Sequence, residues 1–289
     1  MPSQLLNIII IIFLACNSIL SQIPYTLLQP DRQYNLPIIL NEISGLTDLD
    51  IEHLAIVQDE QGLIFIFHLP TGEIIRQFPF DSIGDFEGLS YTGKSLFILR
   101  SDGRLTEWKG FDPKKGGGEI IQHELSLQTK DNEGLCYDDQ HNQLLIAAKS
   151  KPEDPEAKTN RYIYSYNLST GQLTDHIQYT INTEQLSRLA AQYEIPQKEL
   201  NGTGKPKPFN FRPSSLAIHP FTHEIYILSA ADQLLLVINE QGIVVGMESL
   251  DHGLFAKAEG ITFLSDGTML ISNEAAGGVA TVLKYNIKE

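Results

Sequence analysis

Hydrophobic residues occur along the chain in short runs that are separated by clusters of Gly, Asp and Asn. Near the start, such runs span residues 53–57, 63–69 and 73–80, with Gln-Gly and Thr-Gly pairs between them. The runs are four to nine residues long and rich in Ile, Val, Phe and Tyr, which is typical of β-strands joined by tight hairpins. The pattern therefore predicts an all-β fold built of four-stranded units.

A five-residue motif opens each unit and sets the period of the repeat. It reads EISGL, DFEGL, DNEGL, RPSSL and KAEGI at residues 42–46, 85–89, 131–135, 212–216 and 257–261. Its third residue recurs at spacings of 43, 46, 81 and 45 residues. Three of these spacings have the period of propeller blades, which is about 40–50 residues. Five units predict a five-bladed β-propeller with four-stranded blades.

The N-terminal stretch 25–36 is strand-like and has no unit of its own, whereas the fifth unit ends after three runs. We expect this stretch to supply the fourth strand of the last blade, because closing the ring removes exposed sheet edges. The propeller is then one domain that spans residues 24–289.

The spacing of 81 residues contains an insertion at residues 181–211. Asn182 and Gln185 stand at the positions of a capping box, and apolar residues follow at helical spacing up to Pro196. We expect one short helix over residues 183–194. The insertion is either a decoration of the propeller or a lid over one of its faces.

Residues 5–15 form an apolar run, which is shorter than the about 20 residues that a membrane-spanning helix needs. Such a run is typical of a secretory signal peptide, and we assign residues 1–21 to it. Export across the inner membrane is therefore the expected fate of the remaining chain.

The apolar run ends in the sequence FLACN, which resembles the lipid-attachment box of bacterial lipoproteins and makes Cys16 the predicted lipidated residue. Plain secretion, with cleavage after Ser18 or Ser21, and an uncleaved anchor stay open as alternatives. The predicted location is the periplasm or the outer membrane, as a lipoprotein, or alternatively the medium, as a secreted protein.

The chain carries 36 Asp and Glu against 21 Lys and Arg, a formal net charge of −15. Without a basic stripe to neutralise phosphates, nucleic acid is excluded as a partner. Two cysteines exclude a disulfide scaffold and a cysteine-based zinc site. We expect a monomer that meets the membrane only through an N-terminal lipid anchor.

The third position of the motif holds Glu87, Glu133 and Glu259, and it holds Ser44 and Ser214 in the other two units. Equivalent positions of propeller blades lie on a ring around the central axis. Three close carboxylates need protons or a cation, and oxygen ligands without His or Cys favour Ca²⁺ or Mg²⁺. The sequence predicts a calcium site on the three glutamates. The alternative is a structural ring, in which the glutamates accept hydrogen bonds from the backbone and the repeated Gly allows close packing.

The second runs of the units end in polar residues that face the same region. They add Asn273 and Glu274 as candidate ligands of a metal or substrate, beside Ser44 and Ser214. Arg100 and Lys149 are candidates for neutralising the glutamates or binding an anionic ligand. No G-x-S-x-G elbow, P-loop or dinucleotide fingerprint occurs in the sequence.

Four segments resemble the SdiA-regulated family of bacterial propellers, which is distantly similar to NHL-repeat propellers and esterase-like phytase domains. The segments are DFEGLSY (85–91), DNEGLCYD (131–138), RPSSLAIHP (212–220) and KAEGITFLSDGTMLISNE (257–274). The resemblance covers residues 40–289 and implies a five-bladed propeller, an exported location and a bound calcium ion. It carries the metal site to Glu87, Glu133 and Glu259 and leaves the biochemical activity open.

Three functions agree with these observations. The first is a calcium-binding propeller that binds an unidentified ligand or protein at the cell envelope without catalysis. The second is a metal-dependent hydrolase of the lactonase or phosphoesterase type, in which a channel-bound cation activates water and Glu259 or Glu274 is the general base. The third is a structural scaffold within an envelope assembly.

Overall fold

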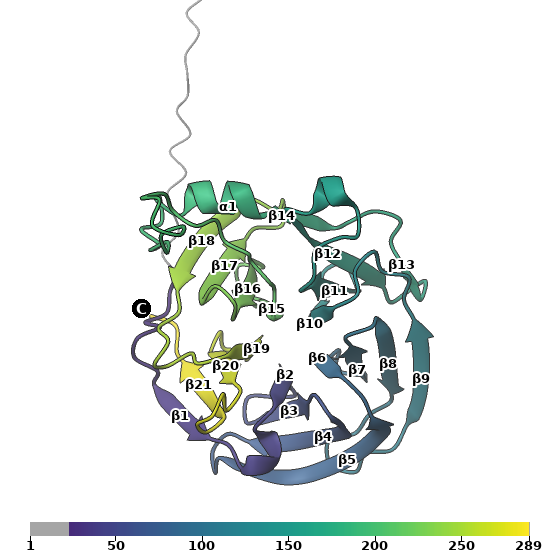
Figure 1. Ribbon diagram of the computed structural model, residues 1–289. Coiled ribbons are helices and arrows are strands. Elements are labelled where there is room, and N and C mark those ends of the chain that lie inside the picture. Colours follow the sequence, from purple (N-terminus) through teal and green to yellow (C-terminus); the bar gives the residue numbers. More distant parts are fainter. Residues whose placement is uncertain (1–22, 289) are drawn as a thin grey trace, which may run out of the picture.

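Each of the five predicted units folds into an antiparallel sheet, and the five sheets stand around a central axis (Figure 1). This computed structural model describes residues 23–288 and shows the predicted five-bladed β-propeller. The predicted signal peptide and the lipidation site Cys16 lie outside the described residues. Within residues 23–288, none of the helices has the length and apolarity required to cross a membrane.

The blades follow one another in chain order, each with its first strand next to the axis. The first blade contains β2 (Ile43–Asp48), β3 (His53–Gln58), β4 (Gln61–His68) and β5 (Glu73–Ile83). The second contains β6 (Phe86–Tyr91), β7 (Ser95–Arg100), β8 (Arg104–Lys109) and β9 (Glu119–Glu124). The third contains β10 (Asn132–Asp138), β11 (Gln143–Ala148) and β12 (Asn160–Asn167), with β13 (Gln172–Leu173) and β14 (Tyr179–Asn182) sharing its outer edge. The fourth contains β15 (Ser215–Ile218), β16 (Ile225–Ser229), β17 (Leu234–Ile238) and β18 (Val244–Ser249).

The fifth blade is closed by the N-terminus, as predicted. It contains β19 (Ala258–Phe263), β20 (Met269–Asn273), β21 (Thr281–Tyr285) and β1 (Arg32–Asn35), in this order from the axis. Strand β1 is shorter than the predicted stretch because Pro30 and Pro37 flank it, and proline cannot donate to a sheet ladder. Upstream, the buried Tyr25 donates a hydrogen bond to the Gly267 carbonyl (2.7 Å).

The glycine of the repeated motif lets neighbouring inner strands approach closely. A Cβ atom on Gly88 would lie 2.6 Å from the Leu135 Cβ and 2.7 Å from the Glu133 carbonyl oxygen of the next blade. Real Cβ atoms do not approach other atoms so closely. In the fourth unit Ser215 stands at this position, and its hydroxyl accepts a hydrogen bond from the Ile261 N–H (3.3 Å).

The insertion packs at the outer rim and not over the axis (Figure 1). Helix α1 (Thr183–Leu189) begins as predicted, because the Asn182 side chain accepts a hydrogen bond from the Gln185 N–H (3.0 Å). It ends before the predicted position 194, where the chain turns to bury Ile195 and Phe209 against Leu186 and strands of blades three and four. Its position favours a decoration that fills the gap between two blades over a lid. Among residues 23–288, the other short helices are 3-10 turns at Ile38–Leu40 and Pro155–Ala157.

The close approach at Gly88 leads to a stability prediction. Gly88→Ala is expected to lower the free energy of unfolding by about 1–3 kcal/mol, since the added methyl group collides with backbone of the next blade. Urea unfolding followed by the fluorescence of the single tryptophan, Trp108, measures this change. Ser215→Ala is the matched control, because a side chain already fits there. Equal losses in both variants would contradict the packing argument.

Candidate functional site

A β-bulge at the start of the inner strands positions the predicted glutamates. The pairing register shifts between Phe86 and Gly88, and the same shift recurs around Glu133 and Glu259. A bulge leaves one residue out of the ladder and redirects its side chain. In each of these strands that residue is the motif glutamate, and in β2 it is Ser44.

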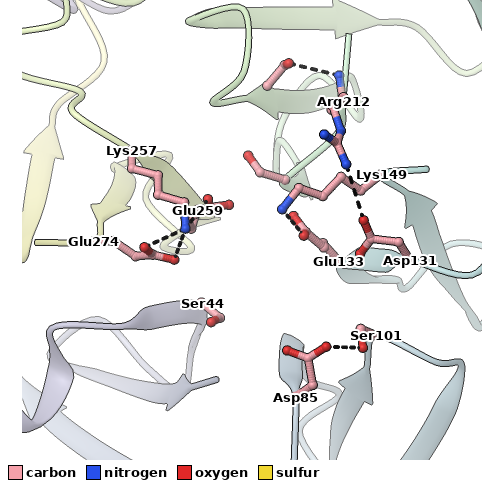
Figure 2. A network of polar contacts seen from close by, with 12 residues as sticks. Ser44, Asp85, Ser101, Asp131, Glu133, Lys149, Arg212, Lys257, Glu259 and Glu274 are labelled. Carbon is pink, nitrogen blue, oxygen red and sulfur yellow. Dashed lines mark hydrogen bonds and ion pairs between the residues drawn. The ribbon is translucent and has the colours of Figure 1, made fainter. Parts of the chain in front are cut away.

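Two lysines stand among the glutamates at this end of the inner strands (Figure 2). The Lys149 ammonium donates a hydrogen bond to Glu133 Oε1. The Lys257 Nζ lies 2.6 Å from both carboxylate oxygens of Glu274 and 3.4 Å from Glu259 Oε1. We call the four carboxylates of Glu87, Glu133, Glu259 and Glu274 the acidic ring.

The acidic ring holds more carboxyl groups than its two lysines can neutralise in the ionised form. Burial, followed by the neighbouring Asp85 carboxylate, raises the pKa of Glu87 to about 8 against the influence of Lys149. Burial, followed by Glu259 and Glu87, raises the pKa of Glu133 to about 9. Burial also raises the pKa values of Glu259 and Glu274. Four glutamates thus share two ammonium groups in a poorly solvated place.

The pKa values of both lysines are raised, although burial acts to lower them. Burial alone would lower the pKa of Lys149, and the Glu133 carboxylate more than offsets this, so that the pKa is raised. The same holds for Lys257, whose pKa is raised by Glu274 and Glu259 against the effect of burial. Both lysines are therefore charged at neutral pH and belong to the ring as resident counter-ions.

Several buried oxygen atoms near the ring have no hydrogen-bond partner within residues 23–288. They are Glu133 Oε2, Asp59 Oδ1 and Asn273 Oδ1. Burial, followed by the charges of Glu42 and Glu274, raises the pKa of Asp59 to about 6. Buried acceptors without donors are rare in folded proteins and point to a missing proton, water or cation.

The hydroxyls of the two predicted serines form hydrogen bonds with the backbone and not with the acidic ring. The Ser214 hydroxyl donates to the Ala258 carbonyl of the next blade (2.7 Å), and the Ser44 hydroxyl donates to the Glu42 carbonyl (3.4 Å). Asn273 donates through Nδ2 to Thr281 Oγ1 (3.1 Å), which leaves its carbonyl oxygen free.

Arg100 does not pair with the acidic ring. Its guanidinium binds the Asp102 carboxylate through two hydrogen bonds, one of them between Nε and Oδ1 at 2.8 Å. Asp102 lies two residues further in the turn after β7, so the local partner is reached more easily than the ring.

The structure adds partners that the motif positions do not reveal. Lys257 opens the fifth motif two residues before Glu259, which is its only signal in the sequence. Arg212 Nη2 lies 3.6 Å from Asp131 Oδ2, and the Ser101 hydroxyl donates to Asp85 (Figure 2). These residues surround the acidic ring with a partly exposed polar border.

The residues of the ring fit a calcium ion by their chemistry. Carboxylate and amide oxygens are the ligands of hard cations. In the described part of the chain, however, no three acidic, His or Cys side chains already stand together as a metal site. Lys149 and Lys257 occupy the neighbourhood of Glu133 and Glu259, so a cation would compete with both ammonium groups for the carboxylates.

Solved structures that resemble this chain share its fold. The glutaminyl cyclase of Myxococcus xanthus is 16% identical, with a TM-score of 0.57, over 90% of this chain and 96% of that one. A chain of a nidogen/laminin complex is 13% identical, with a TM-score of 0.50, over 80% of this chain and 72% of that one. No curated protein matches the sequence. The family model described as SdiA-regulated matches residues 28–200.

The raised pKa values predict a stability that falls as the pH rises. Between the usual carboxyl value of 4.5 and the folded-state values of about 8 and 9, the unfolded chain releases protons that Glu87 and Glu133 retain in the folded state. Folding is therefore progressively disfavoured across this window. In a chelating buffer, we expect the melting temperature to fall by on the order of 5 °C between pH 5 and pH 9.

Glu87→Gln should flatten this dependence, since the glutamine has no proton to lose. Glu153→Gln is the control, because Glu153 is an exposed carboxylate paired with Lys130 and should leave the slope unchanged. A slope that Glu87→Gln does not alter would show that other groups cause it.

Proposed function

Since the chain belongs to the SdiA-regulated family, we propose that it is an exported calcium-binding propeller, which binds a ligand or protein at the cell envelope. One observation carries the proposal, namely the incomplete neutralisation of the acidic ring. Glu133 Oε2 is buried without a partner, and the pKa values of Glu87 and Glu133 are raised to about 8 and about 9. A divalent cation would supply the positive charge that the two lysines do not.

Glu87, Glu133 and Glu259 would hold the cation. They come from the second, third and fifth blades, so the ion would link three blades near the axis. Calcium takes six to eight oxygen ligands in flexible geometry, which suits carboxylates that approach from several directions. When bound, it would stabilise the ionised carboxylates and release Lys149 from Glu133.

The surroundings support binding of a polar or basic partner. Asp85, Asp131 and Arg212 border the ring and are at least partly exposed. The net charge of −15 attracts cations and basic surfaces and repels anionic ones. A noncatalytic binding module needs no more than this rigid, charged surface.

A hydrolase of the lactonase or phosphoesterase type is the second candidate, and Glu87 favours it. Its carboxyl group makes no side-chain hydrogen bond within residues 23–288, and its pKa of about 8 lies where a group can both accept and donate a proton at neutral pH. The similarity to the glutaminyl cyclase does not decide the matter, because at 16% identity it shows the fold alone.

A calcium titration of the chain without residues 1–21 tests the proposal. After chelation, millimolar calcium should raise the melting temperature by several degrees, because a ligand that binds the folded state alone stabilises it. The double variant Glu87→Gln/Glu259→Gln should lose this response, and Glu153→Gln should keep it. If the wild type does not respond, the ring is structural and the calcium proposal fails. If it responds, turnover of lactones or phosphoesters would favour the hydrolase over the binding module.

The envelope location has its own test. In a bacterial host, the full-length chain is expected in the membrane fraction through a lipid on Cys16, and Cys16→Ala should move it to the soluble periplasm or the medium. Metabolic labelling with a fatty acid checks the modification. An unlabelled wild type in the soluble fraction would favour plain secretion.

A further inference from the structure

The end of the inner strands opposite the acidic ring holds a cavity of about 300 Å³. Each inner strand begins at the ring and ends here, so that β2 contributes Asp48 and β6 contributes Tyr91. The fifth residue of the motif lines the cavity in every blade. These residues are Leu46, Leu89, Leu135, Leu216 and Ile261, all of them buried. The side of the cavity toward the acidic ring is therefore apolar.

Asp48 places one carboxylate in the wall of this cavity. Thr262 of the fifth blade fixes it, since the Thr262 hydroxyl donates to Asp48 Oδ1 (3.1 Å) and accepts from the Asp48 N–H (3.3 Å). Within residues 23–288, Asp48 Oδ2 has no hydrogen-bond partner, and this oxygen atom is not fully buried. This oxygen is consequently available to a molecule in the cavity.

The charged side chains that line the cavity favour a ligand of positive charge. Asp48 and Asp139 are its carboxylates, His223 is its imidazole, and neither Lys nor Arg is among the residues that line it. An anion would meet negative charge without a counter-ion, and burying it there is costly. A metal ion would need several oxygen ligands together, whereas the cavity is lined by only two carboxylates, those of Asp48 and Asp139.

The aromatic residues complete the chemistry. Tyr91, Tyr137 and Phe263 line the cavity beside the aliphatic side chains. Aromatic faces attract organic cations, and apolar walls bind the hydrocarbon part of a ligand. The volume lies at the lower end of small-molecule sites, which begin at about 300 Å³.

We propose that this cavity binds a small organic ammonium compound, a primary amine on an apolar body, with the ammonium at Asp48 and the body against the leucines. The site lies at the other end of the inner strands from the acidic ring, so it does not depend on the proposed calcium function.

Isothermal titration calorimetry of the chain without residues 1–21 tests the site, with 2-phenylethylamine and shorter alkylamines as probes. We expect saturable binding of at least one amine and no binding of 3-phenylpropanoate, which has a similar apolar body and the opposite charge. Asp48→Asn preserves size and the contact with Thr262 and should weaken binding about tenfold or more, because a charged hydrogen bond is lost. Glu153→Gln, an exposed carboxylate away from the cavity, should leave binding unchanged.

A second variant covers the event that Asp48→Asn does not fold. Ala217→Leu narrows the cavity while Asp48 is kept, and it should also abolish amine binding. The proposal is overturned if no amine of the panel binds, if amine and carboxylate bind alike, or if folded Asp48→Asn binds as the wild type does. Equal loss of binding in Glu153→Gln and Asp48→Asn would overturn the placement of the ammonium at Asp48.

Discussion

The close approach of five inner strands to one axis is the constraint on which the rest of the structure depends. It requires glycine at four of five equivalent positions, where a Cβ atom would collide with the next blade. The same packing places the residue before the glycine in a bulge and the residue after it toward the opposite end. Close packing at the glycine of the EGL motif thus places the glutamate carboxylate at one end of the axis and the apolar side chain of the next residue toward the other end.

The repetition of the motif around the axis brings the glutamates of the acidic ring together, and this arrangement lowers the stability of the fold. Burying carboxylates close together is unfavourable, and Lys149 and Lys257 offset only part of that cost, since the pKa of each ring glutamate remains raised. The blades themselves are conventional, with long antiparallel ladders and hydrophobic clusters between neighbouring sheets. Local arrangements that contradict the rules of stable folding concentrate at functional sites, and this ring is such an arrangement.

The sequence predicts the fold far better than the site. The spacing of the motif gives the blade count, the unmatched N-terminal stretch gives the closure by β1, and Asn182 gives the start of α1. Pattern alone places residues on the ring but does not say which side chains meet across it. Arg100 pairs with the nearby Asp102, whereas Lys257, the only lysine at the first position of a motif, pairs with Glu274 and Glu259. The end of α1 and the cavity at Asp48 likewise depend on long-range packing that leaves no local signal.

Closure by β1 has a consequence for the order of events during folding. Arg32 is made well before its partner Lys284, which lies at the other end of the propeller sequence. Contacts between distant parts of a chain form slowly, because a long loop must close first. Four blades can pair their strands as they emerge, but the fifth cannot pair β1 before β21 is made. Until β21 has been made, β1 has no partner strand and the propeller is an open arc, which the pairing of β1 with β21 closes into a ring.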